Sequence, residues 1–397
     1  MKMLNFSITD SLNENEKYIF NILVEYFKRD NIKSYVVGGA VRDNLLKIPP
    51  KDVDIAVEGD FELIIKKLPL VERVIYHERF KTSSVYFKNG AQFDIIRCRK
   101  ESYIKNGSLP EVYPATIVED LARRDFTINA VAYDIINNCL IDPYNGIEHI
   151  KRKIIKKIKD DSYKEDPTRI FRAVRYAVRY GFILEDEDEI LRCVEKDVFS
   201  TISYDRIMKE IMLMAGENGW QQNIYECFRL NIIKSSKKSL FHNKVELKDH
   251  LNIRLCSIYR VLNDSTIKNV FKNNSILEKN LKKAFQEYEG IEMELLKCWD
   301  NNHIFNILDK CNSYDLVLLG YNTKLTYKLL NYINLKDKYR EIKAKCLLEL
   351  GIEKGRLIRD IIEEIRRVRL NTLLEIDENY IRNNIGEILN GIKHKNT

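Results

Sequence analysis

The chain has 397 residues, of which 45% are hydrophobic and 31% are charged. This length exceeds that of one ordinary core and predicts two to four domains in a globular protein. The formal net charge of +7 permits an RNA or nucleotide partner without requiring one. No apolar run is long enough to cross a membrane, and the N-terminal segment lacks the apolar core of a signal peptide.

Eight cysteines lie far apart in the sequence and form no CxxC pair. This spacing favours neither a zinc ribbon nor a redox motif, and a disulfide framework is not expected at this size. Dispersed free thiols are typical of a reducing compartment, so we expect a cytoplasmic location. The six histidines are also scattered and form no His-Asp doublet, so a metal phosphohydrolase domain in the C-terminal half is not expected.

In chain order, residues 1–30 are expected to contain a helix, because apolar residues recur at helical spacing from Tyr18 to Phe27. From Ser34 to about Asp142, short β-rich runs alternate with turn residues and helical stretches. The β-rich runs are 35–37, 53–57, 85–87 and 93–96. This texture predicts one compact α/β domain. From about residue 150 onward the pattern is helix after helix, so an all-α region is expected to follow.

The most informative stretch runs from Tyr35 to Val57. A predicted strand leads into Gly38 and Gly39, and a helix is expected to begin near Ala40. Glycines let the backbone approach an anion closely, and a helix N-terminus offers free N–H groups to a phosphate. Arg42, on the first turn, could pair with the same phosphates.

Asp52 and Asp54 are predicted at the start of the next strand, where alternation places both carboxylates on one face. Two adjacent carboxylates repel each other unless a cation lies between them, and hard oxygen ligands suit Mg²⁺ that also contacts substrate phosphates. Asp94, on a later predicted strand, is a candidate third carboxylate. A lone Gly-Gly is usually a turn and a lone Asp-x-Asp is usually a solvated strand end. Their combination within one strand–helix–strand unit predicts two-metal phosphoryl transfer, with Asp52 and Asp54 as metal ligands.

Five segments, in this order, resemble the family of class II tRNA nucleotidyltransferases and bacterial poly(A) polymerases. They are GGAVRD with DVD (38–43 and 52–54), EDLARRDFTINA (119–130), DPYNG (142–146), EDPTRIFRAVRY (165–176) and SYDRI (203–207). The resemblance covers about residues 34–215. It implies an α/β polymerase-β-like nucleotidyltransferase head followed by an all-α neck, body and tail. The implied parts are a catalytic head (1–150), a neck with a nucleotide-reading helix (151–220), a body (221–320) and an RNA-binding tail (321–397).

The sequence departs from the family at two turn positions, where Lys47 and Lys81 stand in place of the usual glycine. The resemblance also implies that Arg123 and Arg124 help to position the ribose and phosphates. Asn129 is a weaker candidate. A local salt bridge within this segment is the alternative for the two arginines.

The family's base-reading positions fall on Asp166 and Arg169. A carboxylate only accepts hydrogen bonds and a guanidinium only donates them. Cytosine and adenine each present an amino donor beside a ring-nitrogen acceptor, whereas uracil and guanine present the reverse pattern, so this pair can select C and A. Asp166, just before Pro167, is also a good helix N-cap and could fill both roles.

Arg169, Arg172, Arg175 and Arg179 fall on one face of the same predicted helix. With no matching row of acids, this face is expected to bind a triphosphate and an RNA end. A solvated surface is the alternative for Arg172 and Arg175.

The activity implied by the resemblance is addition of C and A, from CTP and ATP, to the 3′ end of tRNA without a template, with Mg²⁺ as cofactor. Partial CC or A addition and poly(A) synthesis remain open. Transfer to a small hydroxylated molecule is a weaker alternative, and a tRNA-binding module with an inactive head is the non-enzyme alternative. RNA contacts are expected in residues 220–397, where basic stretches occur at 234–238 and 366–369, with solvated helix surface as the alternative for each. No obligate protein partner is evident.

Overall fold

The computed structural model describes residues 8–233, 251–261, 270–271, 275–320, 322, 324–338, 342–353, 355–373 and 376–393. The chain divides into two compact units, Met1–Lys234 and Ser235–Thr397. The finer boundaries at residues 150, 220 and 320 stay predictions.

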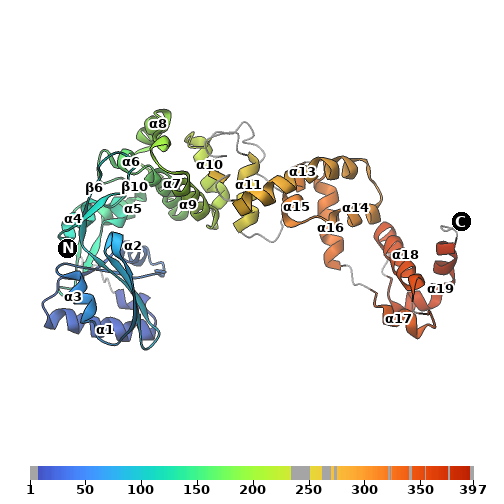
Figure 1. Ribbon diagram of the computed structural model, residues 1–397, viewed down its shortest axis with the longest axis horizontal. Helices are drawn as coiled ribbons and strands as arrows, with labels where there is room; N and C mark the ends of the chain where they lie inside the picture. The colour runs from blue at the N-terminus through green and yellow to red at the C-terminus, as the bar shows by residue number, and fades with distance from the viewer. Residues whose placement is uncertain are drawn as a thin grey trace. The chain divides into compact units, whose positions relative to one another are not determined.

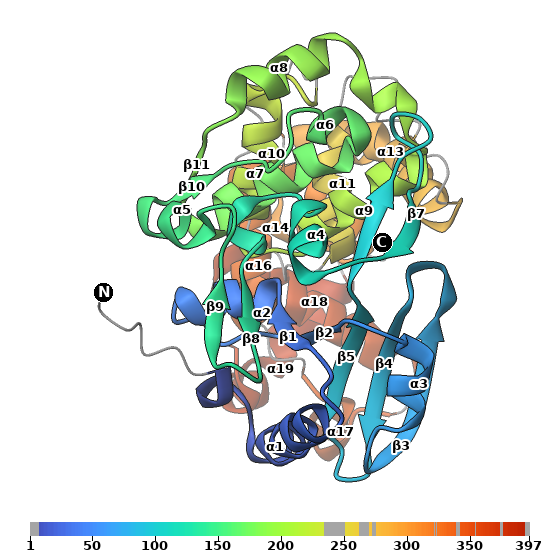
Figure 2. The ribbon, with the colours of Figure 1, turned by 90° about the vertical axis from the view of Figure 1, so that its left-hand side faces the viewer.

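The first unit, which begins at the blue end of the chain in Figure 1, contains a seven-stranded mixed sheet. Its strand order is β3-β4-β5-β2-β1-β8-β9 (Figure 2). β2 and β5 are parallel, and the other neighbouring strands are antiparallel. The strands are β1 (Ser34–Val37), β2 (Asp54–Val57), β3 (Val71–His77), β4 (Thr82–Phe87), β5 (Gln92–Arg97), β8 (Ala132–Asp134) and β9 (Cys139–Ile141). A separate antiparallel hairpin consists of β6 (Arg99–Ser102) and β7 (Glu111–Pro114). The four predicted strand segments correspond to β1, β2, β4 and β5.

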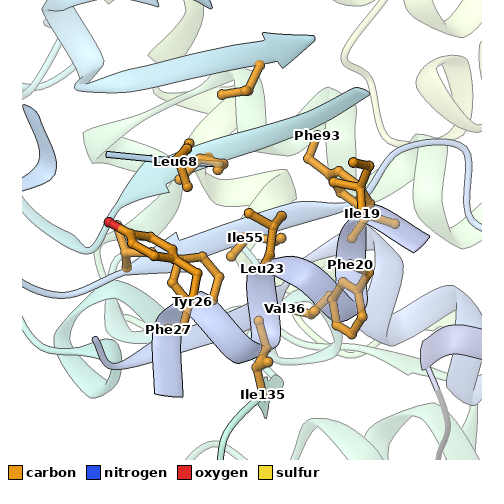
Figure 3. Close-up of a cluster of buried hydrophobic side chains, with 14 of the residues drawn as sticks. Ile19, Phe20, Leu23, Tyr26, Phe27, Val36, Ile55, Leu68, Phe93 and Ile135 are labelled. Carbon is orange, nitrogen blue, oxygen red and sulfur yellow. The ribbon is translucent and has the colours of Figure 1, made fainter. Parts of the chain in front are cut away.

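Helix α1 (Glu14–Arg29) covers one face of this sheet (Figure 3). It begins with a capping box, in which Asn13 and Glu16 each accept a hydrogen bond from the other's backbone N–H at 2.9 Å. Its apolar side chains are buried in one cluster with sheet residues such as Val36 and Phe93. Each such side chain contributes about 1.5–3 kcal/mol by leaving water. The other short helices of the head are η1 (Ile8–Ser11), α2 (Gly39–Leu45), α3 (Phe61–Lys66), η2 (Glu78–Phe80), α4 (Ile117–Ala122), η3 (Thr127–Asn129) and α5 (Gly146–Arg152).

Helices dominate the rest of the first unit. They are α6 (Ser162–Glu165), α7 (Thr168–Tyr180), α8 (Glu187–Glu195), η4 (Val198–Thr201), α9 (Tyr204–Ala215) and α10 (Trp220–Arg229). The expectation of helices alone is wrong at one place, because β10 (Ile154–Ile155) pairs in parallel with β11 (Ile183–Leu184). Runs of two residues are too short for a periodic signal, so the sequence pattern could not show this pair.

In the second unit the described residues form helices and the loops between them, as expected for an all-α region. Its helices are α11 (Leu251–Val261), α13 (Ser275–Lys297), α14 (Asn301–Leu308), α15 (Ser313–Gly320), α16 (Thr326–Lys338), α17 (Ala344–Glu349), α18 (Arg356–Thr372) and α19 (Glu378–Lys393). One hydrophobic cluster forms around Leu295 and Leu329, and another around Ile361 and Ile381. Among the described helices of the whole chain, none has the length and apolar character needed to span a membrane.

The two lysines at the family's glycine positions have left-handed backbones. The φ angle of Lys47 is 59° and that of Lys81 is 49°. A side chain costs roughly 1–2 kcal/mol in this conformation, whereas glycine adopts it freely. The substitution therefore keeps the turn and adds backbone strain.

Candidate active site

The glycine turn lies where β1 ends and α2 begins. Gly38 has φ 71° and ψ −127°, a conformation that glycine adopts and other residues avoid. A Cβ atom on Gly38 would lie 2.8 Å from the guanidinium of Arg124 and 3.8 Å from the carboxylate of Asp54. The absence of a side chain therefore lets an arginine and a carboxylate close in on this backbone. Gly38 and Gly39 both line a cavity of about 540 Å³, which we call the nucleotide cavity.

Arg42 is 5% exposed and is held on several sides. Its guanidinium donates to Asn129 and to Asp43, and its centre lies 5.3 Å and 4.9 Å from the rings of Tyr176 and Tyr180. It lines the nucleotide cavity and also a second cavity of about 560 Å³ beside it. The positive charge of Arg42 is thus held between the two cavities, next to the glycine turn.

The carboxylates approach this turn from β2 and β5. β2 begins at Asp54, so the prediction that Asp52 also lies on this strand is wrong. β1 ends at Val37, opposite Asp54, so Asp52 lies beyond the end of the antiparallel β1–β2 pairing. Both carboxylates nevertheless line the second cavity, and Asp94 lies directly opposite Asp54 in the parallel β2–β5 register.

The electrostatics of these carboxylates suit a cation. Burial raises the pKa of Asp54 to about 6, Arg124 opposes the rise, and Asp94 and Asp52 add to it. One oxygen of Asp94 is buried without a hydrogen-bond partner. Within the described part of the chain, no three acidic, histidine or cysteine side chains form a ready-made metal cluster. This arrangement fits Mg²⁺, which commonly takes one or two carboxylates and completes its shell with water and substrate phosphates.

Arg123 and Arg124 meet on the fully buried carboxylate of Asp120 in α4. Their guanidinium groups lie 2.8 Å and 3.0 Å from its two oxygens. Burial alone would raise the pKa of Asp120, but Arg124 and Arg123 outweigh it and hold the pKa below its usual value. Both arginines also line the nucleotide cavity. The predicted local salt bridge is therefore present, and it presents two cations to the cavity.

Asp166 lies between α6 and α7. Its Oδ1 atom accepts hydrogen bonds from the backbone N and the hydroxyl of Thr168, at 3.0 Å and 2.6 Å, and from Arg206 at 2.7 Å. The hydrogen bond from the Thr168 backbone holds Asp166 at the start of α7, but the N-cap itself is Pro167, one residue later than predicted. Asp166 also lines the nucleotide cavity, so its position is compatible with the predicted base-reading role.

Arg169 is the arginine of α7 that lines this cavity without an acidic partner. Its guanidinium donates to the hydroxyl of Ser162 at 2.6 Å and to the carbonyl of Arg123 at 3.0 Å. In the part of the chain that the structure describes, no carboxylate lies within ion-pair distance of it. Asp166 and Arg169 thus sit three residues apart at one end of α7, facing the same space.

The other α7 arginines do have acidic partners, so the expectation of an unmatched arginine row is wrong. The partners are Asp125 for Arg172, Glu210 and Glu217 for Arg175, and Glu217 for Arg179. These acids come from distant parts of the chain. Arg172 still lines the nucleotide cavity, whereas Arg175 is buried against α9 and is absent from the cavity lining.

Two residues near the cavity were missed by the sequence reasoning. The sequence did contain a signal for Asp120. It lies three residues before Arg123 and four before Arg124, and at both spacings an acid and an arginine can form an ion pair on a helix. Arg206 gave no such signal, since its contacts with Asp166 and Gly107 span 40 and 99 residues of sequence.

Residues 34–156 match the profile of the poly(A) polymerase head domain. The A-adding tRNA nucleotidyltransferase of Halalkalibacterium halodurans is 33% identical over 192 residues, covering 46% of this chain and 45% of that protein. The A-adding enzyme of Aquifex aeolicus is 28% identical over 375 residues, covering 86% of this chain and 45% of that protein. These matches therefore span about half the length of the curated relatives.

Solved structures resemble the fold along the whole chain. A Thermotoga maritima CCA-adding enzyme complexed with tRNA has a TM-score of 0.72 and 23% identity, with 97% of each chain covered. A CCA-adding enzyme in complex with ATP has a TM-score of 0.69 and 22% identity, covering 97% of this chain and 95% of that one.

The mixed sheet, its glycine turn and the facing carboxylates thus lie within the segment that matches the poly(A) polymerase head domain, and helices follow it. Residues 34–156 match the family of poly(A) polymerase head domains, and the fold of the chain is similar to that of CCA-adding enzymes. Nucleotidyltransferases of this family generally use divalent metal ions.

Proposed function

We propose that this protein adds C and A nucleotides, from CTP and ATP, to the 3′ end of tRNA without a template. One observation carries the proposal. A single cavity collects a carboxylate for metal binding, two arginines for phosphates and an Asp–Arg pair for a base edge, contributed by Asp54, Arg123, Arg124, Asp166 and Arg169. The names of similar proteins, which describe A-adding, CC-adding and CCA-adding enzymes, support the same activity.

In this proposal Asp52 and Asp54 hold Mg²⁺, and Asp94 supports them. Bound there, Mg²⁺ would activate the RNA 3′-hydroxyl and neutralise charge on the phosphates. The hydroxyl attacks the α-phosphate in line, and pyrophosphate leaves. Because Asp54 lines both cavities, a nucleotide in one and an RNA end in the other would meet at this carboxylate.

The arginines orient the triphosphate. Asp120 and Asp43 fix the guanidinium groups of Arg123, Arg124 and Arg42, so little side-chain entropy remains to be lost when phosphates bind. The unhindered backbone at Gly38 and Gly39 lets the phosphates approach closely. Arg172 can contribute only by sharing its charge with Asp125, which is 2.6 Å away. Arg175 is better placed to hold α7 against α9 than to touch the nucleotide.

Base selection falls to Asp166 and Arg169. The carboxylate accepts the amino group of cytosine or adenine, and the guanidinium donates to the adjacent ring nitrogen. Uracil and guanine would set an oxygen against the carboxylate and leave buried groups unpaired.

The second unit is the proposed RNA-binding part. The basic stretch 234–238 lies outside the described residues. In the stretch 366–369, the guanidinium of Arg366 lies 4.6 Å from the ring centre of Phe305, and Arg367 pairs with Glu364 at 2.6 Å. These two arginines are therefore engaged within the unit, and RNA contacts from this stretch would have to compete with them. We propose a cytoplasmic location on the basis of the dispersed free cysteines.

A-only addition is the second candidate, because several similar proteins are A-adding enzymes. The test is to incubate the purified protein with tRNA ending at the discriminator base, at the first C or at the second C, and with each NTP separately. CCA synthesis predicts C incorporation on the first two and a single A on the third. A incorporation on the third alone would show an A-adding enzyme. Continued A addition to unrelated RNA would show a poly(A) polymerase, and no incorporation on any RNA would refute the proposal.

A further inference from the structure

Arg206, near the start of α9, contacts both Asp166 and the loop between β6 and β7. One guanidinium nitrogen donates to Oδ1 of Asp166 at 2.7 Å, and another donates to the carbonyl oxygen of Gly107 at 2.7 Å. The Arg206 side chain is 23% exposed and itself lines the cavity. No other arginine described above touches the Asp166 carboxylate.

The first contact fixes which oxygen of Asp166 is free. Oδ1 already accepts two hydrogen bonds from Thr168, and Arg206 supplies the third. A carboxylate oxygen with three donors has no room for a fourth. In the described residues no hydrogen bond reaches Oδ2, so Oδ2 is the acceptor that remains for a base.

The second contact fixes the loop between β6 and β7. Gly107 has φ 74°, and a Cβ atom there would lie 2.4 Å from the carbonyl oxygen of Thr201. Its backbone N–H donates to the carbonyl of Glu165 at 3.0 Å. The same loop contributes Leu109 and Pro110 to the cavity lining. Arg206 therefore ties one wall of the cavity to the carboxylate that reads the base.

We propose that Arg206 is a positioning residue that determines base specificity. Arg206 acts through Asp166, because it holds the Asp166 carboxylate in one orientation and leaves Oδ2 as the single free acceptor. It also holds the β6–β7 loop beside this carboxylate. A carboxylate held only by Thr168 can turn about its Cβ–Cγ bond and tolerate a base that presents an oxygen. This inference rests on the proposed function, because it assumes that Asp166 reads the base.

The experiment measures incorporation of CTP, ATP, UTP and GTP under single-turnover conditions for wild type, Arg206→Ala and Arg206→Lys. Arg206→Ala should lower discrimination against UTP and GTP by about tenfold to a hundredfold, the value of one charge-assisted hydrogen bond. The rate with the correct nucleotide should fall less. Arg206→Lys should restore part of the discrimination, because it keeps the charge but not the two-pronged geometry. Arg229→Ala is the matched control, since Arg229 also pairs with acids but lies outside both cavities.

A double mutant separates action through Asp166 from a general structural role. Asp166→Ala with Arg206→Ala should discriminate no worse than Asp166→Ala alone, because the effect of Arg206 is lost with its target. Wild-type discrimination in both Arg206 variants, or a further loss in the double mutant, would overturn the inference. If Arg206→Ala does not fold by circular dichroism, Arg206→Lys carries the test. A wild-type protein that incorporates nothing would refute the proposed function, and the inference with it, whereas an active wild-type protein and unchanged discrimination in the Arg206 variants would refute the inference alone.

Discussion

Replacing Asp120 with Asn removes the charge on which two cavity arginines converge. Oδ1 of Asp120 accepts from Arg123 at 2.8 Å and 3.0 Å and from the backbone N–H of Arg99 at 3.2 Å. Oδ2 accepts from Arg124 at 3.0 Å and 3.3 Å. An asparagine keeps one acceptor and turns an NH₂ group toward the other guanidinium. At least one arginine, with a side chain only 13% exposed, then loses its neutralising partner.

Removing one member of a buried ion pair costs about 3–5 kcal/mol, because the remaining charge stays buried. For a unit of this size that corresponds to a drop in Tm on the order of 10 °C. Glu101 also pairs with Arg123, at 2.9 Å, which places the loss toward the lower end of that range. Glu111→Gln is a control of the same chemistry at an exposed site, and its cost should stay within about 0.5 kcal/mol.

The assay is thermal and urea unfolding of both variants, together with CTP binding. The pKa of Asp120 is lower in the folded protein than in the unfolded chain, where it is 3.8. The charged carboxylate therefore stabilises the fold above pH 3.8, and this stabilisation is lost as the pH falls from 3.8 toward the folded-state pKa. The difference between Asp120→Asn and wild type should therefore shrink below about pH 4. A loss of stability no larger than that of the Glu111 control, at neutral pH, would refute this reading of the arginine pair.

Three further substitutions test other parts of the site. Gly38→Ala should lower nucleotide incorporation and destabilise the fold by about 1–3 kcal/mol. Gly90→Ala is the control, because Gly90 has φ 85° and no atom lies within 4 Å of an added Cβ, so this variant should lose stability but keep CTP binding. Equal effects of the two substitutions on CTP binding would contradict the account. Lys47→Gly should raise Tm, because it removes roughly 1 kcal/mol of backbone strain, and a lowered Tm would argue against that strain. Asp54→Asn should stabilise the metal-free protein above pH 6. The pKa of Asp54 is about 6 in the folded protein and 3.8 in the unfolded chain, so the wild-type fold loses stability as the pH rises from 3.8 to about 6, and asparagine removes this loss. The gain should approach about 3 kcal/mol in EDTA at pH 7.5, measured by unfolding, and a Tm unchanged by the substitution would contradict it.

Motifs located much of the site because its residues lie close together in the chain. Gly38, Gly39, Arg42 and Asp54 belong to one strand–turn–helix–strand unit, so local periodicity was enough to bring them to one place. The position of Asp166 just before a helix followed in the same way from the Asp-Pro pair.

Partners from distant segments could not be foreseen. The acids that neutralise Arg175 and Arg179 lie 35 to 42 residues away, on and after α9, and helical spacing on α7 alone carries no information about them. β2 likewise begins where its pairing with β1 ends, at Val37 and Asp54, and the sequence of β2 alone does not show this position. In each case tertiary packing, and not local pattern, decided the outcome.

The central claim is that Asp52 and Asp54 bind the divalent cation that drives nucleotide transfer to an RNA end. The direct measurement is single-turnover CTP incorporation into tRNA lacking its CCA end, with Mg²⁺ or with EDTA, for wild type, Asp52→Asn, Asp54→Asn and an exposed control, Asp160→Asn. We predict Mg²⁺-dependent incorporation by wild type and the control, and a loss on the order of a thousandfold in both site variants. Wild-type rates in Asp52→Asn and Asp54→Asn would contradict the account.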